Sequence, residues 1–414
     1  GSPTVEGKLT EADLLKALNL AIPRHDTSIP LTQNGLGYNN LIYIALLLRS
    51  MEHSASEKRG RNAVAYSMLA VEEPEAHLHP ALQYKLLKYF TKQDQTRQIF
   101  MTTHSTHITA GAGLDPIISL SSNYSGEMVV VYPSECFQEN PSGVTSKKYV
   151  ERYLDATKSN MLFSKGVLFV EGIAEQLLIP TLTEYIPGCD LEKQHVSVIN
   201  VGGSTFKHFL PLFGARVQTG VSSLQCRVGC ITDGDPKRRR KSQDKERYKK
   251  CYPYQIDLES SQYEYQAFSS VVINLEEDAN SIANIQVTHS VKTLEYDLAY
   301  ENENSNLIVT DSCTNKAKME EFRLNKDLES DAARKLLDEE TIEDLKKLDE
   351  VEQDKAAFAS AYLESLENSK GEHALDFANA LRNNAENTGE DREDFVIPEY
   401  ISKAIKWACG KGQE

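Results

Sequence analysis

The stretch that decides the fold is Lys165-Gly166-Val167-Leu168-Phe169-Val170-Glu171-Gly172, an apolar run of strand length that ends in a carboxylate and a glycine. A second run of the same kind, Gly229-Cys230-Ile231-Thr232-Asp233-Gly234-Asp235, ends in Asp-x-Asp. Between them, Asn200-Val201-Gly202-Gly203-Ser204-Thr205 predicts the end of a strand, a turn and the start of a helix. Strands and helices that alternate in this way predict an α/β fold with a parallel sheet and crossover helices.

The two strand-end motifs place carboxylates where α/β proteins bind ligands. Parallel strands end at one edge of their sheet, so we expect Glu171, Asp233 and Asp235 to lie together there. Glu175, one helical turn after Glu171, would join them. A single such acid is more commonly a cap or a surface group, but four of them repel one another unless cations are bound. Carboxylate oxygens favour Mg²⁺ or Mn²⁺.

The sequence around these motifs continues the alternation of strands and helices. We expect strands at 166–170, 196–201 and 228–231, helices at 174–186 and 205–217, and a β-leaning, loop-rich segment at 251–300. Acidic amphipathic helices are predicted within 326–372, and a short helix from Pro398 to Ala408. The expected domains are 1–115, a linker at 116–160, the metal-site core at 161–300, an acidic helical region at 301–395, and a C-terminal helix at 396–414.

An earlier α/β segment carries a different set of polar residues. Helices are predicted at 11–20, 39–51 and 80–91, a buried strand at 64–72, and further strands at 98–102 and 128–132. Glu72 and Glu73 directly follow the first of these strands, where one carboxylate can help to hold Mg²⁺ and the next can orient water at a γ-phosphate. His104 follows the next strand and would sense that phosphate. Gly35 and Gly37 lie in a turn that would present N–H groups to phosphate.

A missing phosphate-binding loop limits this nucleotide site. The printed sequence contains no G-x-x-x-x-G-K-[ST] loop, so nothing in it would cradle the phosphates. We therefore expect that the chain either starts inside an ATPase domain or completes its site against another chain, and that ATP binds only with a loop supplied from outside. His77 and His79 are expected to pack or cap a helix, because two histidines alone do not make a zinc site.

The net charge of the whole chain argues against a nucleic-acid substrate, but this charge is distributed unevenly along the sequence. The 45 Lys and Arg residues against 61 Asp and Glu residues give a net charge of −16, about −11 of it in residues 321–414. One segment, 237–250, has nine bases against two acids. It directly follows Asp235, so it predicts either a DNA-contacting loop or a solvated insertion. The bases proposed to contact DNA are Lys237, Arg238, Arg239, Arg240 and Lys241.

The seven scattered cysteines form no C-x-x-C pair, and no apolar run is long enough to cross a bilayer. These features favour a reducing compartment, and we expect a cytoplasmic protein without a membrane partner.

Together these motifs resemble known families. The string from Glu72 to Pro80 with His104 resembles the C-terminal half of an ABC-type ATPase, and the motifs at Glu171 and Asp233 resemble the Toprim domain, a Rossmann-like parallel sheet. A partial ABC-type sheet followed by Toprim, with a helical insertion, resembles the OLD (overcoming lysogenization defect) family of nucleases.

That resemblance implies a divalent-metal-dependent DNA endonuclease or nickase, with two Mg²⁺ or Mn²⁺ ions. Glu171, Asp233 and Asp235 would hold the first ion, and Glu175 and Glu295, with Asp297 as a further candidate, the second. Lys370 would act at the cleavage site. The resemblance also implies phage defence, assembly with further copies through the ATPase domain and a partner helicase. Two alternatives stay open: another Toprim enzyme of the topoisomerase or primase kind, and a DNA-binding scaffold without nuclease activity.

Overall fold

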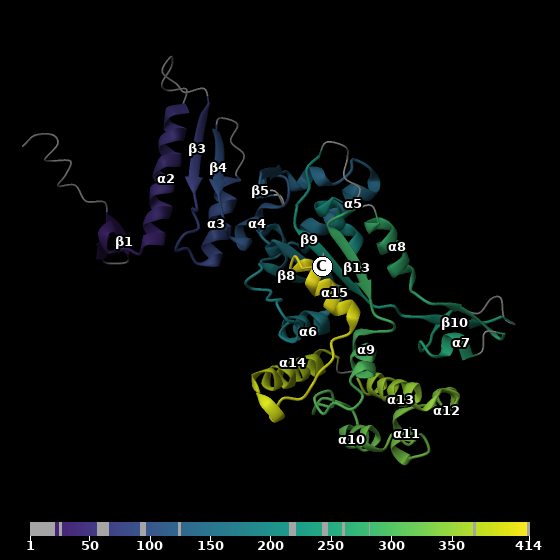
Figure 1. The fold of residues 1–414 in the computed structure, drawn as a ribbon. Helices are drawn as coiled ribbons and strands as arrows, with labels where there is room; N and C mark the ends of the chain where they lie inside the picture. Colours follow the sequence, from purple (N-terminus) through teal and green to yellow (C-terminus); the bar gives the residue numbers. More distant parts are fainter. Residues whose placement is uncertain are drawn as a thin grey trace, which may run out of the picture. The chain divides into compact units, whose positions relative to one another are not determined.

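The computed structural model describes residues 21–24, 27–55, 66–91, 97–122, 126–214, 221–241, 247–258, 261–280, 282–366 and 370–411. The chain divides into two compact units, residues 1–112 and residues 113–414. Figure 1 shows the elements of each unit. The helix expected at 11–20 lies outside the described residues.

The first unit contains two short parallel strands with helices beside them. Its elements are β1 (Ala21–Arg24), β2 (Thr27–Pro30), a 3-10 turn at Leu31–Gln33, α2 (Leu36–Ala55), β3 (Ser67–Glu72), α3 (Pro80–Phe90), β4 (Arg97–Thr102) and α4 (Thr106–Ala112). β3 pairs with β4 in parallel, which confirms the predicted strand–helix–strand order. The expectation of a fully buried strand is wrong, because burial alternates along β3 and Met68 is 64% exposed.

The second unit is built on a parallel sheet of four strands in the order β13-β9-β7-β8. These are β7 (Gly166–Val170), β8 (Val196–Asn200), β9 (Arg227–Thr232) and β13 (Ile285–His289). The three strands expected from sequence are all present, and β13 adds a fourth within the segment 251–300. The mixed α/β class with a parallel sheet is therefore confirmed.

Alternate residues of the central strand serve two separate cores. Leu168 and Val170 of β7 pack into one core together with α6 (Ile173–Thr183) and α15 (Glu399–Ala408). Val167 and Phe169 pack into the other core, which includes the 3-10 turns at Phe206–His208 and Leu210–Phe213. Successive side chains of a strand point to opposite faces of the sheet, so a strand that is covered on both faces contributes to two cores.

The helix expected at 205–217 is replaced by these two 3-10 turns. Pro211 removes a backbone donor, and Gly214 has a left-handed φ of 109°, so the chain turns where a helix would continue.

The segment 116–160, expected to be a linker, is instead packed into the second unit. It contains β5 (Ser119–Ser122), β6 (Met128–Val131), α5 (Pro141–Tyr153) and 3-10 turns at Pro133–Cys136 and Lys158–Leu162. Val131 and Val150 are fully buried in the same core as Phe169. The run of β-branched valines in β6 and a Pro start with an Asn140 cap in α5 account for these elements.

The segment 251–300 contains more helix than its composition predicts. It holds α7 (Gln255–Leu258), β12 (Tyr263–Gln266), α8 (Ser270–Ala279), β13 and α9 (Leu294–Glu301). β12 pairs with β10 (Lys237–Arg240), which also pairs with β11 (Lys249–Lys250), in a separate antiparallel sheet.

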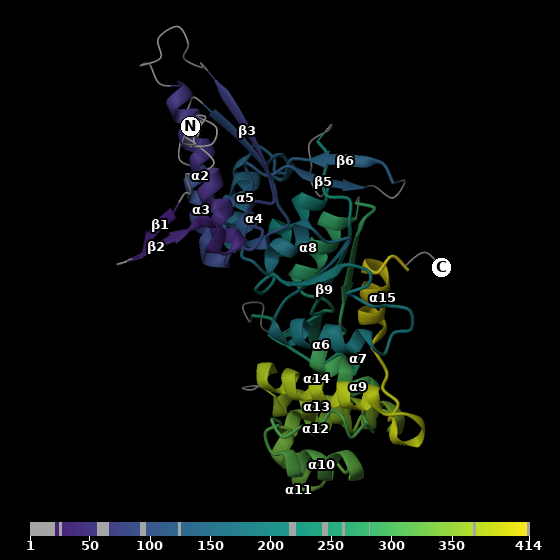
Figure 2. The ribbon, with the colours of Figure 1, turned by 90° about the vertical axis from the view of Figure 1, so that its left-hand side faces the viewer.

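The acidic region is helical, as predicted, and lies next to α6 and α9 of the second unit (Figure 2). Its elements are α10 (Lys316–Asn325), α11 (Asp331–Leu336), α12 (Glu339–Leu345), α13 (Glu350–Ser365), α14 (Lys370–Glu386) and a 3-10 turn at Gly389–Asp391. α14 packs against α6, and α13 packs against α9. These contacts bring the late helices to the same side of the molecule as the strand-end acids.

Candidate active site

The carboxyl ends of β7 and β9 bring the predicted acids together. The two strands are neighbours in register, with Val170 opposite Ile231. Glu171 and Asp233 follow within two residues, and Oε1 of Glu171 accepts a hydrogen bond from the backbone N–H of Asp233 at 3.2 Å. The Thr232 hydroxyl donates to the same oxygen. The sheet edge therefore holds these side chains in contact, as the sequence predicts.

Asp233 lies at the centre of the cluster. Its Oδ1 accepts hydrogen bonds from the backbone N–H of Leu294 at 3.1 Å and from the Ser290 hydroxyl at 3.4 Å. Burial, followed by the charges of Glu295 and Glu175, raises the pKa of Asp233 well above its usual range. A carboxylate in this position is stabilised by a nearby cation.

Glu175 comes from the first turn of α6 and is buried. Its Oε2 accepts a hydrogen bond from the backbone N–H of Gly172 at 3.1 Å, which caps the helix. Burial, with the charges of Glu295 and Glu171, raises the pKa of Glu175 to about 7. Its ionised form therefore depends on a neighbouring positive charge.

Glu295 and Lys370 join the cluster from late in the sequence. Glu295 lies in the first turn of α9, within the segment expected to be β-leaning and loop-rich, and the Thr293 side chain caps this helix. Nζ of Lys370, the first residue of α14, lies 3.0 Å from Oε2 of Glu295. Burial tends to lower the pKa of Lys370, but the charges of Glu295, Asp233 and Glu175 outweigh it and raise the pKa overall. Lys370 is therefore a charged neighbour of the acids.

Asp235 lies at the rim of the cluster, and one of its carboxylate oxygens has no hydrogen-bond partner. Its Oδ2 accepts from Nζ of Lys250 at 2.9 Å, whereas its Oδ1 is buried without a hydrogen-bond partner. The tight turn before it requires glycine, because a Cβ at Gly234 would lie 2.3 Å from the carbonyl oxygen of Ser290. An orphaned carboxylate oxygen is the kind of atom that a metal ion satisfies.

Asp297, the further candidate for the second ion, has both carboxylate oxygens in hydrogen bonds. Its two oxygens accept hydrogen bonds from the backbone N–H groups of Val291 at 2.7 Å and Lys292 at 3.2 Å. Burial raises its pKa to about 6. Both oxygens are therefore used in closing the loop that precedes α9.

The donor chemistry fits a hard divalent cation, although the side chains do not form a closed cage. In the part of the chain that the structure describes, no three His, Cys, Asp or Glu side chains converge closely enough to hold a metal ion as they stand. The five neighbouring acids offer only oxygen ligands, and Asp235 offers an oxygen without a partner.

The basic segment forms a sheet rather than a free loop. Arg238 pairs with Glu340 at 2.6 Å and Arg239 with Glu264 at 2.6 Å. Nε of Arg240 donates to the Tyr263 hydroxyl at 3.2 Å. Acids and a tyrosine thus already bind the three arginines predicted to contact DNA. Lys237 begins the same strand and Lys241 follows it.

The first unit arranges the nucleotide-type residues at the ends of β3 and β4. Glu72 ends β3, and Glu73 follows with a left-handed φ of 39°. Nε2 of His104 lies 3.6 Å from Oε1 of Glu73. Glu75 accepts hydrogen bonds from the Thr103 hydroxyl and, at 3.0 Å, from the His104 backbone. The predicted neighbours Glu73 and His104 are therefore in contact.

The glycines and histidines of the first unit have distinct structural roles. A Cβ at Gly37 would lie 2.3 Å from the carbonyl oxygen of His77, so this close approach requires glycine, whereas Gly35 has open space around it. His79 caps α3 by accepting from the N–H of Ala81 at 3.2 Å, as expected. His77 has a φ of 62°, typical of a turn.

Two residues of the site environment have no signal in the sequence pattern. His373, one turn after Lys370, is buried and joined to the Tyr362 hydroxyl and, at 2.8 Å, to the Thr310 hydroxyl. Lys292 is buried and donates to the carbonyl of Cys251 at 3.0 Å. The i, i+3 spacing of Lys370 and His373 would have pointed to one helix face.

Parts of both units are similar to known domain families. Residues 3–109 match the AAA ATPase domain family, and residues 162–235 match the family described as overcoming lysogenization defect protein-like, TOPRIM domain. The chain is 26% identical over 200 residues to Endonuclease GajA of Bacillus cereus (strain HuB5-5), covering 43% of this chain and 28% of that protein. It is 26% identical over 178 residues to the Old nuclease of Escherichia phage P2, covering 42% and 30% respectively.

The matched part of the chain thus spans less than a third of these two relatives. Among solved structures, the C-terminal region of the Burkholderia pseudomallei OLD protein covers 60% of this chain and 98% of its own, with 16% identity and a TM-score of 0.33. Residues 3–109 are thus similar to an AAA ATPase domain and residues 162–235 to an OLD-like TOPRIM domain, in the order that the motifs predict.

Proposed function

We propose that this chain is the cleaving part of a divalent-metal-dependent DNA endonuclease or nickase. The observation that carries the proposal is the group of acids around Asp233, whose pKa is raised by burial and by the charges of those acids, with the charged Lys370 beside them. A bound cation would relieve the repulsion between these buried acids, which supports a metal site here.

Glu171, Asp233 and Asp235 would hold one Mg²⁺ or Mn²⁺ ion, and Glu175 and Glu295 a second. When bound, two such ions activate a water molecule and stabilise the leaving oxygen of a phosphodiester. Asp297 is left out of this set, because both of its oxygens already bind backbone N–H groups.

Lys370 supplies a fixed positive charge in this proposal. Its side chain is 43% exposed, so the ammonium group is accessible from solvent while Glu295 holds it in place. A positioned cation of this kind stabilises the charge that develops on phosphate oxygens during cleavage.

The printed names of the relatives support a nucleic-acid substrate. One is named an endonuclease and the other a nuclease, and residues 162–235 of this chain, which hold four of the acids, match an OLD-like TOPRIM domain family. DNA would approach beside Asp235, where β10 begins. We infer that the basic stretch from Lys237 to Lys241 forms the surface that faces DNA, with its three arginines held in place by the partners described above.

The first unit would couple cleavage to a nucleotide cycle. Glu72, Glu73 and His104 provide the hydrolytic side of such a site, and the phosphate-binding loop would come from outside this sequence. We infer assembly with further copies through this unit and a cytoplasmic setting, with a helicase as partner and phage defence as the biological role. In the described residues no helix is long and apolar enough to span a membrane.

Nicking of supercoiled plasmid tests the proposal. Purified protein with Mn²⁺ or Mg²⁺ is expected to produce open circles, and chelation is expected to stop the reaction. A protein that binds plasmid yet leaves it intact with every divalent metal would instead support a DNA-binding scaffold. Relaxation of supercoils without a nick would support a topoisomerase-like Toprim enzyme.

A further inference from the structure

The strand β13 lies at one edge of the four-stranded sheet. The inner side of this strand pairs with β9: Asn284 accepts from Val228, and Ser290 donates to Thr232. Because successive residues of a strand alternate in direction, Val287 and His289 turn their backbone N–H and C=O groups to the other side. In the described part of the chain no other strand pairs with that side. This leaves a row of backbone donors and acceptors free to receive an added strand.

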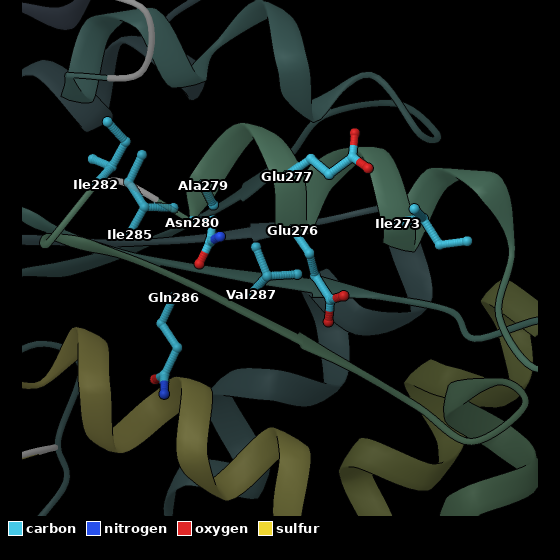
Figure 3. Close-up of a pocket in the computed structure, with 9 residues that line it drawn as sticks. All are labelled: Ile273, Glu276, Glu277, Ala279, Asn280, Ile282, Ile285, Gln286 and Val287. Carbon is cyan, nitrogen blue, oxygen red and sulfur yellow. The ribbon is translucent and has the colours of Figure 1, made fainter.

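The outer side of β13 is bordered by two cavities. One, of about 570 Å³, lies between α8 and β13, and Figure 3 shows the side chains that line it, with Glu276 beside Val287 and Gln286 directed toward α15. The other, of about 970 Å³, runs from Glu276 along β13 to Tyr296 and Tyr400. The two share Glu276, Gln286 and Val287. The strand edge is therefore the floor of a continuous groove that can hold side chains on both faces of an added strand.

The charges around this groove have one sign. The acids that line the two cavities are Glu276, Glu277, Asp297, Glu301, Glu352 and Glu399. The only lysine lining them is Lys403, and Glu399 pairs with it at 2.7 Å. Nε2 of His289 lies 3.8 Å from Oε1 of Glu276. An incoming segment therefore meets negative charge together with the aromatic faces of tyrosines.

We propose that the outer edge of β13 is a docking site for an extended, lysine- or arginine-bearing segment of a partner protein, which adds as a fifth strand. Backbone hydrogen bonds to Val287 and His289 would give affinity, and the acids of the groove would select basic side chains. A second copy of the same edge fits poorly, because it would bring the same acids face to face. The proposal does not depend on nuclease activity, since it concerns an edge rather than the acid cluster.

A synthetic peptide tests both parts of the proposal. The probe is a fluorescent, blocked peptide of four Lys-Val repeats, titrated against the full chain by anisotropy. Its comparison peptides are four Glu-Val repeats and a fully backbone-N-methylated Lys-Val peptide, which keeps the charge but cannot add as a strand. Only the first peptide is expected to bind. Equal binding of the N-methylated peptide would overturn strand addition, and equal binding of the acidic peptide would overturn charge selection.

Hydrogen exchange and a charge reversal locate the site. Saturating Lys-Val peptide is expected to slow exchange of the Val287 and His289 amides by at least about tenfold. Glu276→Lys is expected to weaken binding at least about fivefold, whereas the exposed Glu386→Lys on α14 leaves it unchanged. Binding without protection at Val287 and His289 would overturn the proposal. So would dimerisation of the chain through this edge in the absence of peptide.

Discussion

Nζ of Lys370 lies 3.0 Å from Oε2 of Glu295, and this ion pair joins α14 to α9 beside the ends of β7 and β9. Both residues lie after the strand-end motifs in the sequence, and Lys370 lies well over a hundred positions after them. Their contact completes a group of acids with one fixed cation.

Lys370→Met is expected to lower the rate of plasmid nicking by about 10²- to 10³-fold, because it removes a positioned charge from the cleavage site. Lys370→Arg keeps the charge but changes its geometry, so it is expected to retain an intermediate rate. Time courses at saturating DNA measure both rates. Wild-type rates in Lys370→Met would exclude this role.

Asp235→Asn is expected to reduce nicking by at least about 100-fold while the protein stays folded. The substitution keeps the shape of the side chain but removes the charge that would bind the ion. Thermal unfolding in the absence of metal serves as the control and should be close to that of the wild type. Normal nicking by Asp235→Asn would remove this residue from the proposed metal ligands.

Asp297→Asn is expected to show the opposite pattern. Its two carboxylate oxygens each accept a backbone hydrogen bond and Asn has only one acceptor oxygen, so one N–H would lose its partner and the free energy of unfolding should fall by about 1–3 kcal/mol. Urea unfolding measures this loss. The nicking rate per folded molecule should stay within a few-fold of wild type, and a loss as large as that of Asp235→Asn would return Asp297 to the metal site.

Asp233→Asn is expected to stabilise the metal-free protein by about 1 kcal/mol or more, since it removes a buried charge that its neighbours repel. Added Mn²⁺ should raise the unfolding temperature of the wild type but not that of the variant. An equal response of the two proteins to Mn²⁺ would place the metal elsewhere.

The buried His373 is expected to make stability depend on pH. Burial lowers its pKa to about 4, below the ordinary value of 6.5, so the folded state binds fewer protons than the unfolded state between these values. The neutral, buried His373 therefore contributes fully to the free energy of unfolding above about pH 6.5. Its contribution falls by about 2 kcal/mol between pH 7 and pH 5. Urea unfolding of wild type and His373→Gln at both pH values measures it. The variant should lack this part of the slope, and identical slopes would contradict the assignment.

The sequence predicted the parts of the site that depend on local pattern. Apolar runs of strand length ending in carboxylates located Glu171 and Asp233, because parallel strands must end together. The helix of Glu295 was missed, since a short segment with Thr293 as its cap has no long apolar period. The hydrogen bonds that Asp297 accepts come from the N–H groups of Val291 and Lys292 in the preceding loop, which spacing does not reveal.

Long-range pairing explains the remaining differences. The charge of 237–250 predicted an open basic loop, but Arg238 finds Glu340 about a hundred residues later, and composition cannot show such a partner. The predicted linker folds because Val131 and Val150 are buried against the core around Phe169. Tertiary contacts of this kind override local composition.

The most direct test of the account is the rate of metal-dependent nicking by Asp233→Asn compared with Asp311→Asn, an equally conservative change at an exposed carboxylate 93% accessible to solvent. With Mn²⁺ and supercoiled plasmid, Asp311→Asn should cut at the wild-type rate, and Asp233→Asn should be slower by at least about a thousandfold. Equal rates of nicking by the two variants would contradict a nuclease centre at the ends of β7 and β9.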